Sequence, residues 1–294
     1  MILITGAGGQ VGSELVKRLS AAGVRLRTGH SSAEKAASSA AAGLDAALAD
    51  FARPATLRQA LVGVEKVFLV SGNSPQQREL ELGALEEARR AGVELLVKLS
   101  VWGAESGAFW LAREHRLVEQ AIEASGVPFV FLRPNSFMQN FVRFHADSIR
   151  DRGAFYLPGG AARISHIDVR DIAAVAAKVL TEPGHQGKAY ELSGPEALTY
   201  GEIAGQLSAA LGRTIAHLEI SEAELTGALL ESGATHSYAA ALTELVRYYL
   251  AGQASRVSPA VERIIGRQPI SFDQFAQDYA AIFQGGQVPQ PGIS

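Results

Sequence analysis

The stretch Ile2-Leu3-Ile4-Thr5-Gly6-Ala7-Gly8-Gly9-Gln10-Val11-Gly12 decides the fold that we expect for this chain. Its apolar opening predicts a buried strand, and the glycine cluster predicts a turn after that strand. Val11, Leu15 and Leu19 then recur at a helical spacing, which indicates one apolar helix face. A strand, a glycine turn and a helix start form a phosphate-binding site, because free amides and the positive end of the helix dipole point at the turn.

Each of three glycines in this turn has a predicted role. Gly6 permits the tight turn, Gly9 lets a pyrophosphate approach the backbone, and Gly12 lets the helix pack on the strand. The spacing G-x-x-G-x-x-G is one residue off the dinucleotide fingerprint, so the alternative is a glycine-rich turn that binds nothing. The residues expected to contact the cofactor here are Gly6, Ala7, Gly9, Gln10, Val11 and Gly12.

Composition bounds the class of protein. The chain has 294 residues, a length that is typical of one large or two unequal domains. Its formal net charge of −3 and its composition are typical of a globular protein, and it has no cysteine. Neither nucleic acid nor an anionic membrane is an expected partner at this charge. The lack of cysteine excludes disulfides, thiolate-bound metals and a cysteine nucleophile. Seven histidines show no H-x-x-x-H or H-E-x-x-H spacing, so no metal is expected.

Targeting and membrane signals are also absent from the sequence. The first predicted strand starts at Met1, which leaves no room for a signal peptide. No apolar run approaches the ~18 residues that a membrane span needs. We therefore expect a cytoplasmic protein without a membrane partner.

Strand and helix patterns alternate after the opening stretch. Further strands are predicted at 24–28, 46–49, 67–70, 95–100 and 128–132, with helices between them. This alternation predicts an α/β fold, a Rossmann-type doubly wound parallel sheet with right-handed crossovers. Ligands of such sheets bind at the carboxyl ends of the strands.

Beyond residue 141 the alternation is lost. A turn-rich connector is predicted at 153–160, and the helices expected after it lie at 200–211, 222–252 and 271–283. We predict a Rossmann domain over 1–155, completed by 161–195. A smaller, mostly helical substrate or lid domain is predicted over 196–294.

The end of the second predicted strand should meet the adenine ribose of a dinucleotide. Sites that prefer NAD usually place an acid there. This chain has Gly29-His30-Ser31-Ser32 instead, with Arg27 and Lys35 nearby. Cations and hydroxyl groups favour a 2′-phosphate, so we assign Arg27, Ser31 and Lys35 to NADP, with NAD as the alternative. The other interpretation is that both cations are solvated surface charges.

Polar residues also follow the third and fourth strands. Asp50 is positioned to accept the adenine amino group, with Phe51 packing on the ring, or to cap the helix that Pro54 leads. The small residues expected beside the cofactor after the fourth strand are Ser71, Gly72 and Asn73.

Several segments resemble the NmrA-like group of atypical short-chain dehydrogenases/reductases, and together they cover nearly the whole chain. They are Thr5–Gly12, Asp50–Phe51, Val97–Ser100, Glu114–Pro128, Phe131–Phe137, Ser165–Ala173 and Gly184–Leu192. The resemblance implies an NAD(P)H-dependent reductase, similar to those that act on quinones and triphenylmethane dyes. The same fold group contains regulators that bind the cofactor and catalyse nothing.

One departure from ordinary short-chain dehydrogenases concerns their Tyr-x-x-x-Lys pair. The corresponding stretch is Leu111-Ala112-Arg113-Glu114-His115. Leu111 has no proton to give, whereas His115 takes the lysine position and is able to bond the ribose. Ser100 matches the serine that ends strand five in the family. A second departure is Ser31, where many relatives carry an arginine for the 2′-phosphate.

These residues lead to a hypothesis about the reaction. The nicotinamide is expected near Ser100, His115 and Asn135, the candidate catalytic residues, with Trp102, Asn135 and Phe137 lining an acceptor pocket. The reaction would transfer hydride to a quinone or a similar conjugated, aromatic acceptor, because reduction to an aromatic phenolate needs little acid help. The alternative is a non-catalytic redox sensor that acts through a regulatory protein partner, and a homodimer is also possible.

One further group of polar residues resembles a site. His166, Asp168 and Asp171 lie close together before and within a predicted helix at 172–180. The simpler interpretation is helix capping by Asp168 and dipole complementation by Asp171.

Overall fold

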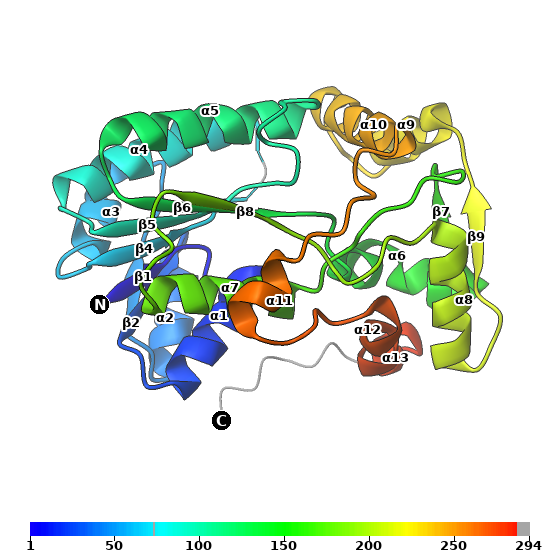
Figure 1. Ribbon diagram of the computed structural model, residues 1–294, viewed down its shortest axis with the longest axis horizontal. Helices are drawn as coiled ribbons and strands as arrows, with labels where there is room; N and C mark the ends of the chain where they lie inside the picture. The colour runs from blue at the N-terminus through cyan, green and yellow to red at the C-terminus, as the bar shows by residue number, and fades with distance from the viewer. Residues whose placement is uncertain (73, 287–294) are drawn as a thin grey trace.

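The computed structural model of the protein describes residues 1–72 and 74–286. Its centre is a seven-stranded sheet in the order β3-β2-β1-β4-β5-β6-β8, in which every pair is parallel (Figure 1). The strands are β1 (Ile2–Ile4), β2 (Leu26–His30), β3 (Ala46–Leu48), β4 (Lys66–Leu69), β5 (Leu95–Leu99), β6 (Phe129–Pro134) and β8 (Lys188–Leu192).

Helices cover both faces of this sheet. One face carries α1 (Gln10–Ala21), α7 (Val169–Thr181) and α11 (Ala260–Ile265). The other carries α3 (Pro54–Ala60), α4 (Gln77–Arg90) and α5 (Trp110–Ser125), while α2 (Ala33–Ala41) packs beside β2 and β3. Each face covers its own hydrophobic core, which explains why the central strands β1, β4, β5 and β6 are mostly apolar. The predicted doubly wound parallel sheet is confirmed.

A smaller unit with its own core lies beyond one end of the sheet (Figure 1). Its elements are α6 (Gln139–Arg152), β7 (Ala154–Leu157), α8 (Tyr200–Leu211), β9 (Ala216–Glu219), α12 (Phe272–Asp278) and α13 (Ala280–Phe283). Phe141, Phe155 and Phe272 meet edge to face at its centre. β7 lies inside the stretch that we predict as a connector, because its parallel partner β9 is remote in sequence.

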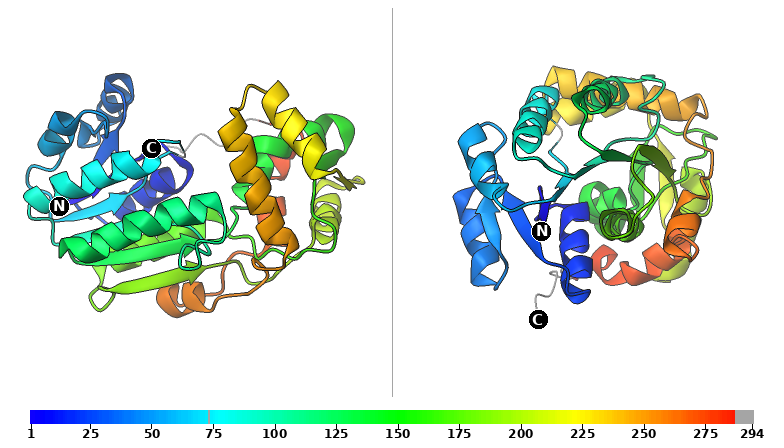
Figure 2. Two further views of the ribbon diagram at one scale, coloured as in Figure 1. Left: turned by 90° about the horizontal axis from the view of Figure 1, so that it is seen from above. Right: turned by 60° about the vertical axis from the view of Figure 1, so that its left-hand side comes forward.

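The predicted helix at 222–252 is two helices, α9 (Glu222–Glu231) and α10 (His236–Leu250). Gly233, with a φ of +89°, separates them, and Thr235 caps the second. Glu244 ties α10 to the start of α5, since its Oε2 accepts the Trp110 N–H (2.7 Å) and pairs with Arg113 (2.8 Å). Figure 2, viewed from above, places both helices on the side of the molecule away from α2 and α3.

Each of the two units is built from segments that are not continuous in sequence. α6 and the first two residues of β7 lie within the predicted 1–155 domain but pack in the core of the smaller unit. α11 lies within the predicted 196–294 domain but packs on α7 and β8. Local patterns do not reveal this arrangement, because each segment has an ordinary amphipathic sequence. None of the helices that the structure describes has the length and hydropathy to span a bilayer.

The second strand ends two residues later than its pattern predicts, at His30 rather than at Thr28. Gly29 resembles a turn residue but lies inside the strand. A Cβ at Gly29 would lie 3.1 Å from Ala49 Cβ and 3.2 Å from the Ile4 carbonyl oxygen. Close packing between strands, rather than turn formation, therefore accounts for this glycine.

Candidate functional site

The order of strands reverses between β1 and β4, so the crevice of this sheet lies at their carboxyl ends. Thr5 joins these two ends. Its hydroxyl lies 3.0 and 2.9 Å from the carbonyl oxygens of Phe68 and Val70, and it accepts the Val70 N–H at 2.8 Å. The glycine turn after β1 and the Ser71 segment after β4 are therefore held on either side of the crevice.

The glycine turn forms a cradle at the start of α1. Gly6 has a φ of +58°, and its carbonyl oxygen accepts the Gly9 N–H at 2.9 Å. A Cβ at Gly12 would lie 2.2 Å from that same oxygen, so only glycine allows the first helical turn to pack this closely. Gly9 is the N-cap and provides no side chain to bond the first-turn amides. These amides have no partner within the helix and suit an anion such as a pyrophosphate.

The neighbouring residues of the turn complete this cradle. Ala7 is buried, whereas Gln10 is half-buried at the first position of α1. Val11 points into the core beneath the turn. The backbone amides of the turn and of the first helical turn, rather than side chains, are therefore what the cradle offers to a phosphate.

Arg27 does not lie at the carboxyl end of β2. It pairs in register with Leu3, and its guanidinium contacts Asp45 through Nε (2.9 Å) and Nη2 (3.2 Å). Nη1 donates to the carbonyl oxygens of Ala60 (2.9 Å) and Val62 (3.0 Å). These contacts occupy the side chain away from the strand end, so the structure does not bring Arg27 to the predicted 2′-phosphate site.

We expect Arg27→Ala to destabilise the fold by about 1 kcal/mol, because it removes the donor to the part-buried Ala60 carbonyl oxygen, whereas water can replace it at the exposed Val62 carbonyl. The ratio of NADPH to NADH affinity should stay unchanged. Denaturant unfolding and calorimetry measure the two quantities. Arg25→Ala, at an exposed position just before β2, is the control and should change neither. A changed affinity ratio in Arg27→Ala would return Arg27 to the cofactor site.

Ser31 and Lys35 lie where the prediction places them, just past the end of β2. Both are exposed. Ser32 caps α2 by accepting the Lys35 N–H at 3.3 Å, so the Lys35 backbone is used while its ammonium group faces solvent. The structure also brings Lys35 near His30, which local sequence patterns do not single out as a site residue.

Asp50 follows β3 and organises its own turn. Its carboxylate accepts the Ala52 N–H at 3.0 Å and pairs with Arg53 at 2.7 Å. The N-cap of α3 is Arg53, so Asp50 does not cap that helix directly. Phe51 packs half-buried against the core on the α3–α4 face. The adenine contacts of both residues stay predictions.

Ser71, just past β4, donates its hydroxyl hydrogen to Glu81 Oε1 at 2.7 Å. Glu81 is itself held by Lys98 from β5, with 2.6 Å between Nζ and Oε2 and both side chains almost fully buried. Because its hydrogen is committed, the Ser71 oxygen is left only to accept from a ligand. Gly72 is exposed, and Asn73 lies outside the described residues.

Ser100 follows β5, and its hydroxyl, like that of Ser71, donates its hydrogen to a buried glutamate. Its hydroxyl donates to Glu119 Oε1 at 2.7 Å, and the fully buried Glu119 also pairs with Arg133 (2.8 Å) and Arg116 (3.2 Å). A hydroxyl that gives its hydrogen to a buried carboxylate is not a proton donor to a substrate. The geometry therefore restricts Ser100 to accepting a hydrogen bond.

His115 is buried between α4 and α5 with 6% of its surface exposed. Its Nε2 lies 3.3 Å from Gln77 Nε2, and its Nδ1 is buried without a partner in the described structure. Burial, aided by the charge of Lys98, holds the pKa of His115 well below its ordinary value. The ring is thus neutral at neutral pH and does not offer a cation to a ribose.

Asn135 and Trp102 are covered by the chain after α10. Asn135, 4% exposed, donates to Ser165 Oγ and to the Ala254 carbonyl oxygen, both at 2.9 Å, and accepts the Ser136 N–H. The Trp102 indole donates to the Gln253 carbonyl oxygen at 3.2 Å. Both side chains therefore fasten this segment to the sheet, and the amide of Asn135 has no free group to orient a ligand.

Contacts of Arg256 and Phe137 complete this region. The Arg256 guanidinium lies over the Trp102 ring, 4.9 Å from its centroid, and pairs with Glu191 of β8. Phe137 is half-buried against the core under α7 and bridges to Ile167 through its backbone. The predicted acceptor-pocket residues thus pack against protein in the structure.

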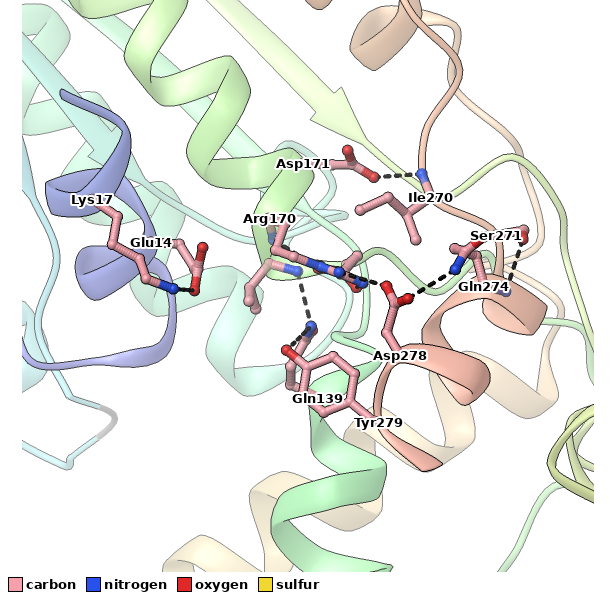
Figure 3. A network of polar contacts seen from close by, with 12 residues as sticks. Glu14, Lys17, Gln139, Arg170, Asp171, Ile270, Ser271, Gln274, Asp278 and Tyr279 are labelled. Carbon is pink, nitrogen blue, oxygen red and sulfur yellow. Dashed lines mark hydrogen bonds and ion pairs between the residues drawn. The ribbon is translucent and has the colours of Figure 1, made fainter. Parts of the chain in front are cut away.

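The cluster of His166, Asp168 and Asp171 is structural. Asp168 caps α7 by accepting the Arg170 N–H at 2.8 Å, as predicted. Asp171 accepts the Ile270 N–H at 2.7 Å and so anchors the chain before α12 (Figure 3). His166 packs among aromatic rings, and burial lowers its pKa to about 4. Across residues 1–72 and 74–286, no group of three potential metal ligands is present.

An all-parallel sheet with an uncapped glycine turn at its switch point defines the class of NAD(P)-binding Rossmann proteins. A family model described as NAD(P)H-binding matches residues 6–183. The chain is 37% identical over 292 residues to the NAD(P)H azoreductase of Xenophilus azovorans, covering 96% of this chain and 99% of that protein. It is 32% identical to quinone oxidoreductase 2 of Escherichia coli, covering 79% and 82% of the two chains.

Solved structures give the same result. The NADPH complex of the Escherichia coli NADPH-dependent quinone oxidoreductase superposes with a TM-score of 0.86 at 29% identity, over 95% of this chain and 99% of that one. The Citrobacter sp. triphenylmethane reductase complexed with NADP(H) has a TM-score of 0.84 at 26% identity, over 95% and 99%. The chain belongs to the NAD(P)H-binding family, and the resemblance to NmrA-like short-chain dehydrogenases/reductases is confirmed. It is an NAD(P)H-dependent reductase.

Proposed function

We propose that this reductase transfers hydride from NADPH to a quinone or a similar flat, conjugated acceptor. The observation that carries the proposal is that neither Ser100 nor residue 111 offers an acidic proton to an acceptor at the end of β5. The hydroxyl hydrogen of Ser100 is given to Glu119, and Leu111 stands where ordinary short-chain dehydrogenases have their tyrosine. An acceptor reduced here must hold the negative charge itself, and a quinone does so as an aromatic phenolate.

The residues that would hold the cofactor follow from the strand ends. The glycine cradle would bind the pyrophosphate through backbone amides. Ser71, left as an acceptor by Glu81, suits a hydroxyl or amide donor of the nicotinamide half. The residues 29–32 at the end of β2 include no carboxylate for a ribose hydroxyl, and Lys35 follows them in the first turn of α2 beside Glu34, which favours NADPH over NADH.

In this reaction the chain acts through binding and positioning. The bound cofactor supplies the hydride, and the fixed geometry of the cradle and of Ser71 sets the orientation of its reactive end. The relatives named for azo, quinone and triphenylmethane reduction support acceptors that are flat and conjugated. A homodimer and a regulatory protein partner stay predictions.

Steady-state kinetics across quinones, azo and triphenylmethane dyes, and simple ketones tests the proposal. We expect turnover of the conjugated acceptors with NADPH. For ketones, kcat/KM should be at least about a hundredfold lower, which is the usual contribution of a general acid. Efficient ketone reduction would contradict the proposal. Tight NADPH binding without any turnover would favour the redox sensor.

Ser100→Ala is the matched variant for this test. Because the Ser100 hydrogen is committed to Glu119, we expect the variant to keep quinone kcat within about tenfold of the parent, well short of the loss of a general acid. Thermal unfolding checks that Glu119 stays satisfied by Arg133 and Arg116. A loss of about a thousandfold in a folded variant would show that Ser100 does give up its proton.

A further inference from the structure

His30 is the last residue of β2 and lies next to the glycine cradle. The residue before it, Gly29, accepts the Ala7 N–H of the cradle at 3.4 Å, and His30 itself accepts the Ala49 N–H at 2.7 Å through its carbonyl oxygen. The imidazole is therefore carried at the carboxyl edge between the ends of β1 and β3. This is the place where the adenine ribose of a dinucleotide meets the second strand.

The ring of His30 is buried but unsatisfied. The residue is 8% exposed, and its Nε2 is fully buried without a hydrogen-bond partner. Buried polar side chains almost always have a partner, and leaving one without costs free energy. A ring placed in this way at the carboxyl edge of the sheet is suited to form a hydrogen bond with a ligand.

The charges around this ring favour an anion. Lys35, in the first turn of α2, is close enough to act on the imidazole, and it forms no ion pair in the part of the chain that the structure describes. Asp50 beyond β3 is paired with Arg53, and Arg27 on β2 with Asp45. Glu34 shares the first turn of α2 with Lys35. Burial and the charge of Lys35 lower the pKa of His30, so the imidazole is neutral at neutral pH.

We propose that His30 binds the 2′-phosphate of NADPH and takes up a proton as it does so, with Ser31 and Lys35 completing the anion site. The inference rests on the proposed function, because it places the adenosine ribose of NADPH at the end of β2. A phosphate beside the ring favours the imidazolium, so the bound state holds one more proton than the free state. By linkage, NADPH binds more tightly as pH falls through the bound pKa, and the gain is complete below the free pKa. NADH has no 2′-phosphate and lacks this dependence.

Titration of the histidine ring signals by NMR tests the proton uptake directly. His30→Gln identifies the His30 signal by its loss. We expect saturating NADPH to raise the pKa of His30 by at least about one unit, and NADH to leave it in place. His236→Gln, at an exposed position on α10, is the control for an unrelated histidine.

Calorimetry gives the second readout. Between about pH 8 and pH 6, we expect the ratio of wild-type to His30→Gln affinity for NADPH to rise about tenfold, the equivalent of one pKa unit. The 2′-phosphate itself titrates near pH ~6, but it does so with both proteins and cancels in the ratio. The corresponding ratio for NADH should be flat. Lys35→Gln should weaken NADPH binding, and the gain in affinity should already be complete at a higher pH, because the loss of this charge raises the pKa of His30 in the free protein.

An unchanged His30 pKa on NADPH binding, or the same pH dependence in wild type and His30→Gln, would overturn this inference and leave the proposed reductase intact. If wild type binds no NADPH at any pH, the inference and the proposed function both fail. Should His30→Gln not fold, the NMR titration of the wild-type protein decides, with the signal assigned through Lys35→Gln, whose charge loss raises the His30 pKa in the free protein.

Discussion

Gly9→Asp is expected to lower the affinity for NADPH about a thousandfold in a protein that stays folded. Gly9 is the exposed N-cap of α1 and forms the mouth of the glycine cradle. A carboxylate about 4 Å from a phosphate charge is repelled by about 4 kcal/mol at an effective dielectric of about 20, or roughly three factors of ten. Aspartate is itself a favourable N-cap residue, so the helix should keep its start.

Gly9→Asn separates charge from size in this experiment. Asparagine has the shape and the capping preference of aspartate but carries no charge, so we expect it to cost about tenfold at most. Calorimetry gives the affinities, and thermal unfolding confirms the fold. Equal losses in the two variants would mean that bulk rather than charge excludes the cofactor. An unchanged affinity in folded Gly9→Asp would contradict the phosphate site.

Glu81→Leu should lower the free energy of unfolding by about 3–5 kcal/mol. The change leaves Lys98 as a buried ammonium without its counter-charge, and this is the costly way to break a buried ion pair. Lys98 and Glu81 are 0% and 1% exposed, so water does not replace the lost partner. Ser71 loses its acceptor at the same time, so NADPH binding should weaken as well.

The double variant Glu81→Leu/Lys98→Met tests the cause. With both charges removed, we expect most of the lost stability to return, because apolar residues of similar volume replace buried pairs at little cost. Glu79→Leu, at an exposed position on the same helix, should stay within about 0.5 kcal/mol of the parent. Chemical denaturation measures all three. A double variant as unstable as Glu81→Leu would attribute the loss to packing.

Local patterns predicted the parts of the fold that form locally. The turn between β1 and α1 depends on neighbouring residues, and the alternation of apolar strands with helices follows from covering both faces of one sheet. The pattern predicts too early an end for β2, at Thr28, because Gly29 and the serines after His30 have turn preferences. Packing of Gly29 against Ala49, a tertiary contact, decides that the strand continues.

The candidate site was predicted less completely than the fold. The pattern placed Asn135 and Trp102 correctly past the ends of strands, but it did not reveal that residues 253–254 cover them. Coverage by remote chain has no local signature. Two features of the sequence do point to buried ion pairs, namely Lys98 in an otherwise apolar strand and Glu119 on the apolar face of α5. A charged residue at a buried position indicates that a residue of opposite charge is buried beside it.

The hydrogen bond from Asn135 to the Ala254 carbonyl oxygen has a consequence for the order in which the protein folds during synthesis. The two residues are 119 positions apart. At a synthesis rate of about 5–20 residues per second, the ribosome therefore adds Ala254 roughly 6–24 s after Asn135. Throughout that interval the nascent chain already contains the glycine cradle, whereas the ends of β5 and β6 await their cover. A nascent chain stalled before residue 254 would therefore present a complete cradle beside bare strand ends, a natural substrate for a chaperone.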